Sequence, residues 1–303
     1  LYLVQHSDLT VLSISDPASP VLLGQFDVSN INHPAPGHIR DVAVRGDYAY
    51  CANFTEGLKT VDISDPASMV VTATNEYEGV GVCEYAARGL DIEGDTLFMC
   101  QDGYGLMAFD LSDPAAPALM TNFISSHNPF PYDNLDDVDV EGTNAYVIGG
   151  KRFWIYGVSD PSNMVELAHW ENGSGGPTDG IGIHDVDAEG DFVHLPTSWG
   201  SYTNAYGTQL DRGGLRLMDV TDKATPEPRG RFITSGQGWD MEIVDDLAYV
   251  ANYHSGVHIV NVTNWTRLGR YNTEGIAMGI DVTDGGDTLL VADGENGLVV
   301  LDA

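Results

Sequence analysis

The sequence predicts an all-β fold, a β-propeller of about seven four-stranded blades in which the first and last blades are incomplete. Three observations carry this prediction. A short aliphatic and β-branched run, closed by Ser/Thr-Asp-Pro or a variant of it, recurs along the 303 residues. A second strand-like run precedes it at a regular offset, and its turn glycines repeat with a period of about 48 residues, as propeller blades do. No segment shows helical length or helical periodicity.

The first motif predicts the third strand of each blade and the turn that leaves it. Its alternating apolar residues are typical of a strand, and Asp-Pro after the strand is a turn signal, because Asp bonds the local backbone and Pro ends the ladder. One such strand cannot bury its faces alone, but a series of stacked units can. The copies are Leu9–Ala18, Gly57–Ala67 and Gly105–Ala115, with weaker copies at Phe153–Ser162, Gly214–Ala224, Gly256–Trp265 and Gly297–Ala303.

The second motif predicts the first two strands of each blade, joined by a tight Gly or Asp turn. Its copies are Arg40–Tyr50, Arg88–Phe98, Asp136–Tyr146 and His184–His194, followed by Trp239–Tyr249 and Met278–Leu290 with shifted spacing. We therefore expect one propeller domain over 1–303, with blades at about 1–28, 38–78, 87–125, 135–171, 183–234, 239–272 and 278–303. The first unit lacks its first strand and the last unit lacks its fourth. Such open strand edges invite pairing, so self-assembly through the terminal blades is one hypothesis.

The charge of the chain argues against some classes of binding partner. The net charge is −32 and the pI is near 4.1, which argues against a nucleic-acid or anionic-membrane partner. The acidity suits either solubility in a salty or extracellular setting or the binding of divalent cations. No apolar run is long enough for a transmembrane helix. The chain starts with Leu inside a strand-like segment, which indicates a mature or excised part of a longer protein.

Three cysteines, Cys51, Cys83 and Cys100, show neither CxxC spacing nor a disulfide framework. We expect buried free thiols, and a single bridge remains an alternative.

Several segments resemble one known repeat family. VDISDPA (61–67) and FDLSDPA (109–115) resemble the LVIVD repeat, and GDYAYCAN (46–53) and DLAYVANYHSG (246–256) are similar to its second-strand part. The resemblance covers nearly the whole chain. It implies a propeller of the kind often found in secreted or surface-anchored bacterial and archaeal proteins, and it implies no fixed enzymatic activity. An extracellular or cell-surface location follows as an expectation.

The residues just before each predicted first strand form the first candidate site. In a propeller the first strand is innermost, so these residues are expected at the mouth of the central channel, where an anionic or sugar-like ligand would bind. The alternative is that Arg and Asp of neighbouring blades pair and seal the channel. The residues are Arg40, Arg88, Asp136, His184 and Trp239, with Met278 in the last blade.

Carboxylates along the same strands form the second candidate site. Mid-strand acids are costly against apolar sheets, but they suit a water-filled channel or Ca²⁺. The alternative is hydrogen bonding between blades, in which each carboxylate accepts donors from its neighbour. The predicted metal ligands are Asp91, Asp139, Asp187, Glu242 and Asp281, and a second set two residues earlier comprises Asp41, Asp137, Asp185 and Asp240.

Loops and histidines add to the predicted channel face. Ser125–Asn134 and the insertion Pro196–Gly214 carry aromatic residues suited to a carbohydrate or protein partner, or to a self-packed cap. His33, His38, His127 and His184 fall on or near the same face and could join carboxylates around a transition metal. His6, His169, His194, His254 and His258 are interpreted as ordinary strand or turn residues.

The sequence contains no GxSxG, HExxH or GxxxxGK[ST] motif, and no catalytic residue is predicted. Our first hypothesis is a non-enzymatic extracellular or cell-surface propeller, a binding or assembly scaffold for a protein, a glycan or neighbouring subunits, with Ca²⁺ as its one candidate cofactor. The alternative is a metal-dependent, lactonase-like hydrolase with its site at the channel mouth.

Overall fold

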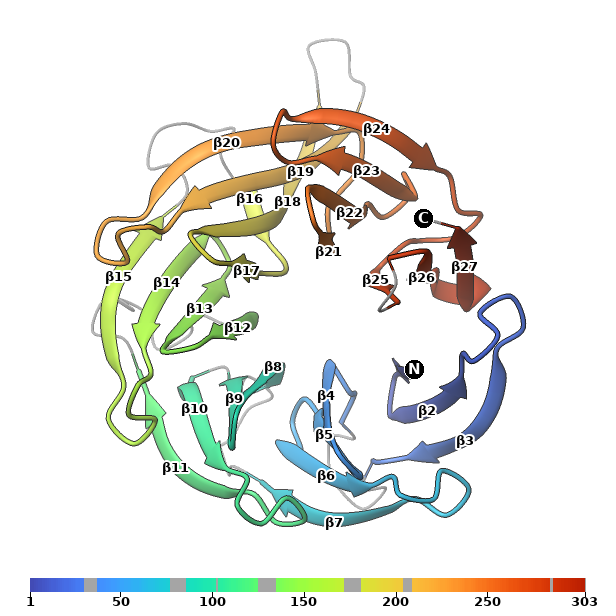
Figure 1. Cartoon of the computed structure of the whole chain (residues 1–303), viewed down its shortest axis with the longest axis vertical. Coiled ribbons are helices and arrows are strands. Elements are labelled where there is room, and N and C mark those ends of the chain that lie inside the picture. The colour runs from blue at the N-terminus through green and yellow to red at the C-terminus, as the bar shows by residue number, and fades with distance from the viewer. Residues whose placement is uncertain are drawn as a thin grey trace. The chain divides into compact units, whose positions relative to one another are not determined.

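The computed structural model describes residues 1–29, 37–76, 86–101, 103–124, 135–171, 181–203, 209–283 and 286–302, without the side chains of 181, 199–203 and 209–212. Seven antiparallel sheets, arranged as a β-propeller, follow one another along the chain (Figure 1). Within the described residues, the single helical element is a 3-10 turn, η1 (Gly294–Asn296). The predicted fold class, including three-stranded first and last blades, is confirmed.

Contacts divide the chain into two compact units, residues 1–147 with 156–166 (unit 1) and residues 148–155 with 167–303 (unit 2). The early blades are β1 (Tyr2–Gln5), β2 (Asp8–Ser13) and β3 (Val21–Asp27); β4 (Asp41–Arg45), β5 (Tyr48–Ala52), β6 (Leu58–Asp62) and β7 (Val70–Asn75); and β8 (Ala87–Glu93), β9 (Thr96–Gln101), β10 (Gly105–Asp110) and β11 (Ala118–Phe123). The fourth blade, which contributes residues to both units, comprises β12 (Asp137–Glu141), β13 (Asn144–Gly149), β14 (Arg152–Gly157) and β15 (Val165–Glu171).

The later blades belong to unit 2. They are β16 (Ile181–Ile183), β17 (Asp187–Glu189), β18 (Phe192–Thr203), β19 (Gln209–Asp219) and β20 (Glu227–Thr234); β21 (Asp240–Val244), β22 (Leu247–Ala251), β23 (Val257–Asn261) and β24 (Thr266–Tyr271); and β25 (Gly279–Val282), β26 (Thr288–Ala292) and β27 (Leu298–Asp302). In a four-stranded blade we name the strands A to D in chain order. In the fifth blade β16 and β17 both pair with β18 and together take the place of strand A. The first blade supplies only B, C and D, and the last only A, B and C.

Glycine turns between strands A and B set the repeat. Gly46, Gly94, Gly142 and Gly190 have φ values of 59°, 59°, 61° and 62°, in the left-handed region that other residues rarely adopt. Each turn reverses the chain so that strand B pairs antiparallel with strand A. The predicted 48-residue period of these glycines therefore reflects one tight turn per blade.

The core lies between neighbouring sheets. In unit 1, Tyr50 and Leu58 of the second blade pack with Leu97, Met99 and Phe109 of the third, all of them buried. Burying a large apolar side chain contributes about 1.5–3 kcal/mol, so these layers hold the blades together. Strand D, by contrast, is the outer edge of its sheet, and its first residues are exposed, as in β3 and β7.

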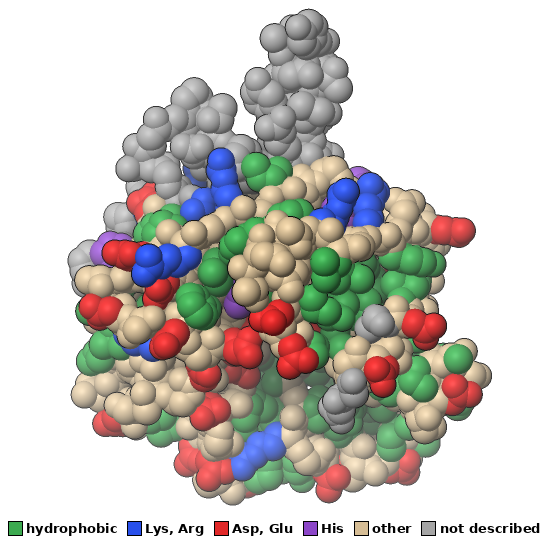
Figure 2. Space-filling model, turned by 45° about the horizontal axis from the view of Figure 1, so that its top comes forward, with side chains coloured by type: hydrophobic (Ala, Val, Ile, Leu, Met, Phe, Trp, Pro, Cys, Tyr) green, Lys and Arg blue, Asp and Glu red, His purple; other side chains and the backbone are tan. Residues whose placement is uncertain are grey.

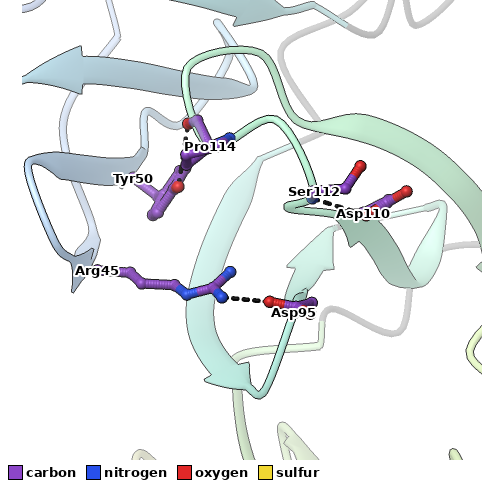
Figure 3. A network of polar contacts seen from close by, with 6 residues as sticks. All are labelled: Arg45, Tyr50, Asp95, Asp110, Ser112 and Pro114. Carbon is purple, nitrogen blue, oxygen red and sulfur yellow. Dashed lines mark hydrogen bonds and ion pairs between the residues drawn. The ribbon is translucent and has the colours of Figure 1, made fainter.

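The Asp-Pro turn of strand C binds the blade before it. Tyr50 donates its hydroxyl to the Pro114 carbonyl at 3.0 Å, and the Thr72 hydroxyl donates to the Ala115 carbonyl at 2.8 Å. Figure 3 shows the Tyr50 contact together with a second link between these blades, the Arg45–Asp95 ion pair. The recurring motif is therefore architectural.

The fifth blade departs from the expected loop. The insertion Pro196–Gly214 extends β18 and β19 into a long hairpin instead of a loop over the sheets. Cys51 is a buried free thiol, as expected, Cys100 is buried as well, and Cys83 lies outside the described residues. In the part of the chain that is described, no helix is long and apolar enough to cross a membrane.

Candidate functional site

Inner-strand carboxylates of unit 1 join neighbouring blades. Asp41 accepts hydrogen bonds from the Val42 amide of its own strand and from the Leu90 amide of the next blade, each at 2.7 Å. Asp91 repeats this one blade further, with the Ile92 and Val140 amides at 2.7 Å. A carboxylate shared between two backbone amides in this way is a strong hydrogen-bond acceptor, so each is an inter-blade clip.

Unit 2 repeats the clip twice in succession. Asp185 accepts from the Val186 amide at 2.8 Å and from the Met241 amide at 3.0 Å. Asp240 accepts from the same Met241 amide at 2.9 Å and from Ile280 at 2.7 Å. Burial first, and then the neighbouring Asp185 carboxylate, raise the pKa of Asp240 well above its usual value. This shift favours the protonated form of the Asp240 carboxyl.

The remaining predicted metal ligands lie around these clips. The Asp139 and Asp91 side chains share a hydrogen bond, and burial raises the pKa of Asp91. In unit 2, burial and the charges of Asp187 and Asp281 raise the pKa of Glu242 to about 7. Among the described residues no group of three or more His, Cys, Asp or Glu side chains is arranged to hold a metal ion. Calcium binding stays a prediction, while inter-blade hydrogen bonding is observed for Asp41, Asp91, Asp185 and Asp240.

Turns between strands B and C make a second set of inter-blade bonds. The carbonyl of a turn residue accepts the amide of a residue at or just before the start of strand A of the next blade. His6 accepts from Ile39 at 2.6 Å, Phe54 from Ala87 at 2.9 Å, and Tyr253 from Ala277 at 3.2 Å. All three acceptors have positive φ, 54°, 38° and 49°, which is uncommon for residues with a side chain and costs about 1–3 kcal/mol each. The strain places three aromatic rings next to the predicted ligand-binding residues.

In unit 1 this arrangement gathers His6, His38, Arg40 and Phe54, which we call the unit 1 cluster. The His6 and His38 rings lie 5.8 Å apart, and His38 lies 6.5 Å from Phe54. The Arg40 guanidinium carbon lies 5.1 Å above the centre of the Phe54 ring. His6, His38 and Arg40 are exposed, so donors and an aromatic face are open to solvent.

In unit 2 the equivalent positions form an aromatic stack, the unit 2 cluster of His184, Ser198, Trp239 and Tyr253. The His184 and Trp239 rings stack at 4.4 Å and 17°, and Trp239 stacks on Tyr253 at 5.8 Å. A hydrogen bond joins His184 Nε2 to the Ser198 hydroxyl. The members are partly exposed.

The predicted ligand-binding residues thus separate into three groups. Arg40 and the pair His184 and Trp239 enter the two clusters. Arg88 and Asp136 form an ion pair at 3.0 Å, so for these two residues the alternative holds, in which Arg and Asp of neighbouring blades pair with each other. Met278 is exposed.

Sequence reasoning missed His6, Phe54 and Tyr253. His6 was interpreted as an ordinary strand or turn residue, and the signal for the other two is an aromatic residue directly after the Asn that follows strand B, at Asn53-Phe54 and Asn252-Tyr253. The predicted loop residues His33, His127, Phe130, Tyr132 and Tyr206 lie outside the described residues, as do the side chains of Trp199 and Tyr202.

Comparison with known proteins identifies the repeat family of the chain. The family model of the LVIVD repeat matches residues 1–34, 36–74, 86–124, 134–170 and 274–303, more than half of the chain. The chain belongs to the LVIVD-repeat family. No curated protein matches it.

Solved structures share the fold of this LVIVD-repeat protein at low identity. A putative 6-phosphogluconolactonase of Bacteroides fragilis is 12% identical with a TM-score of 0.71, covering 90% of this chain and 80% of its own. The WD40 domain of Neurospora crassa Pan2 is 11% identical with a TM-score of 0.65, covering 99% and 87%. The computationally designed Ika8 protein is 6% identical with a TM-score of 0.60, covering 100% and 95%. At such identities the likeness concerns the fold alone.

Proposed function

We propose that this protein is a non-catalytic binding scaffold in which the unit 1 cluster and the unit 2 cluster are each, by itself, a contact surface for a ligand or partner. One observation carries the proposal. Partly exposed aromatic, imidazole and guanidinium groups converge at the starts of the A strands, on backbone that is bonded from blade to blade. Rigid placement of such groups lowers the entropic cost of binding.

The surrounding surface supports an extracellular setting. Asp and Glu side chains are spread over the face drawn in Figure 2, with few Lys and Arg among them. A large net charge keeps a protein soluble and monomeric, and aromatic side chains of the cluster type are enriched in protein and carbohydrate interfaces. A secreted or surface-bound receptor for a protein or glycan is consistent with these features and with the family.

A metal-dependent hydrolase is the second candidate. The observation in its favour is Glu242, whose pKa near 7 beside Asp187 and Asp281 would suit either a general acid or a cation ligand. The Asp185 and Asp240 carboxylates are instead occupied by backbone amides.

A thermal-shift panel tests the proposal. The folded protein is heated with saccharides, organic carboxylates, phosphates, lactones and Ca²⁺, and every hit is repeated with Arg40→Ala and Trp239→Ala. We expect at least one compound to raise the melting temperature of the wild type without being consumed, and one of the two variants to lose that shift. Turnover of a lactone that stops with EDTA or in Glu242→Gln would favour the hydrolase and overturn the scaffold.

A further inference from the structure

We propose that the unit 1 cluster binds an oxyanion, a carboxylate, phosphate or sulfate group, with Arg40 as its principal contact. This inference rests on the proposed binding function, and it gives one of the two clusters a ligand class.

Arg40 differs in its surroundings from the arginines that are ion-paired, and it shares its aromatic contact with Arg216, which lies over Trp170. Arg45, Arg88 and Arg229 each lie against a carboxylate, of Asp95, Asp136 and Asp219 respectively. The chain holds 45 acidic residues against 13 Lys and Arg, so a carboxylate neighbour is the common case. Within the described residues Arg40 has no ion-pair partner, and its guanidinium lies over Phe54 instead.

The aromatic contact orients the guanidinium for a ligand. A cation–π contact with a ring does not take up the guanidinium N–H groups as donors to a carboxylate, so they stay available for a ligand. Those groups form a fork that matches two oxygens of a carboxylate, phosphate or sulfate. Arg40 is exposed, so the fork is accessible.

Two imidazoles supply further donors. His38 lies 6.5 Å from Phe54, and His6 lies 5.8 Å from His38, ring centre to ring centre. A ring nitrogen that carries a proton donates to an oxyanion, and each imidazole has at least one. The cluster thus combines one permanent cation with two rings that donate hydrogen bonds.

Buried groups below the cluster fix its backbone. The Gly37 amide donates to the buried Glu56 carboxylate at 2.8 Å, and Glu56 pairs with buried Lys59 at 2.9 Å. A side chain at Gly37 would meet the Asn53 amide oxygen at 2.3 Å, so the segment that carries His38 lies tightly against the turn that carries Phe54. On the other side, Ile39 donates to the His6 carbonyl. The donors are therefore held in place before a ligand arrives, which favours binding.

Titration calorimetry at low ionic strength tests the inference, with sodium phosphate, sulfate and acetate as separate probes. The three arms distinguish a site for tetrahedral oxyanions from one for carboxylates. We expect saturable binding of at least one probe, weakened about tenfold or more in Arg40→Ala and less in Arg40→Lys, because lysine keeps the charge but loses the fork. His38→Gln should weaken binding several-fold. Arg229→Ala, which removes an exposed arginine from unit 2, is the matched control and should bind as the wild type does.

Two outcomes overturn the inference. One is the absence of binding by all three anions to a wild type that is folded by circular dichroism, and the other is equal binding by the Arg40 and Arg229 variants. If the anions do not bind but panel compounds still raise the melting temperature, and that shift disappears only in Trp239→Ala, the oxyanion site fails while the scaffold stands. If no compound depends on either cluster, the proposed function fails as well.

Discussion

Replacing Glu242 with Gln should stabilise the folded chain at alkaline pH and leave it unchanged at acidic pH. Glu242 lies on β21 in unit 2, where burial and the charges of Asp187, Asp281 and Asp185 oppose its ionisation. Gln keeps the size and the hydrogen-bonding capacity of the protonated acid but carries no charge. The variant therefore removes the repulsion without opening a cavity.

The magnitude follows from the pKa. It rises from 4.5 to about 7, and at about 1.36 kcal/mol for each pKa unit the cost of ionising Glu242 in the folded chain reaches about 3.4 kcal/mol. Glu242 is only partly buried, and water screens part of this repulsion, so we expect about 1–2 kcal/mol. Because the folded pKa is raised, the wild type keeps its full stability below pH 4.5, where Glu242 is protonated, and it loses about this amount as pH rises through about 7.

Urea denaturation at pH 4, 5.5, 7 and 8.5 measures the difference. The free energy of unfolding of Glu242→Gln should equal that of the wild type at pH 4 and exceed it by about 1–2 kcal/mol at pH 8.5. Glu189→Gln, an exposed position on β17 of the same unit, removes the same formal charge and should give a much smaller difference. A stabilisation that is the same at every pH, or a variant that is less stable at pH 8.5, would refute the electrostatic reasoning.

Three further predictions concern the architecture. Asp91→Ala leaves the partly buried Ile92 and Val140 amides without their acceptor, so it should lower the free energy of unfolding by about 2–4 kcal/mol, and a loss below about 0.5 kcal/mol in urea would contradict the clip. In Gly24→Ala the added carbon would lie 1.7 Å from the Pro66 carbonyl oxygen, so we expect the free energy of unfolding to fall by about 1–3 kcal/mol. Ser19→Ala, in an exposed turn, is the control and should change little, and equal melting temperatures of the two variants would contradict this packing. Burial raises the pKa of the Cys51 thiol to about 12, so Ellman's reagent should modify Cys51 only after denaturation, and rapid modification of Cys51 in the folded protein, mapped by mass spectrometry, would show that the site is open.

The fold could be predicted because each blade carries its own local signals. Gly46 and its equivalents mark tight turns through the positive φ that they adopt, and the Asp-Pro pairs mark the ends of the C strands. The long hairpin of β18 and β19 was missed because its Gly- and Ser-rich sequence is typical of a loop. Pairing with its neighbours in register, rather than local propensity, decides that segment.

The site could be predicted only in part. The acids of the inner strands were found, and hydrogen bonding between blades was one of the two uses considered for Asp41, Asp185 and Asp240. Which use applies depends on whether a backbone amide of the next blade reaches the carboxylate, and that is a matter of tertiary geometry. His6 was missed for the same reason, because its left-handed turn and its bond to the next blade leave no trace in the sequence, whereas Phe54 shares the Asn-aromatic pair with Tyr253.

Histidine-selective NMR during titrations with phosphate, sulfate and acetate tests the central claim most directly, since the chain's nine histidines include cluster and buried positions. His6 and His38 lie in the unit 1 cluster, whereas His194 and His258 are buried elsewhere and serve as internal controls. Our account predicts saturable shifts of the His6 and His38 ring signals, with His194 and His258 unmoved and the shifts lost in Arg40→Ala. His6 and His38 signals that stay unchanged with all three anions, or equal shifts at the buried histidines, would contradict it.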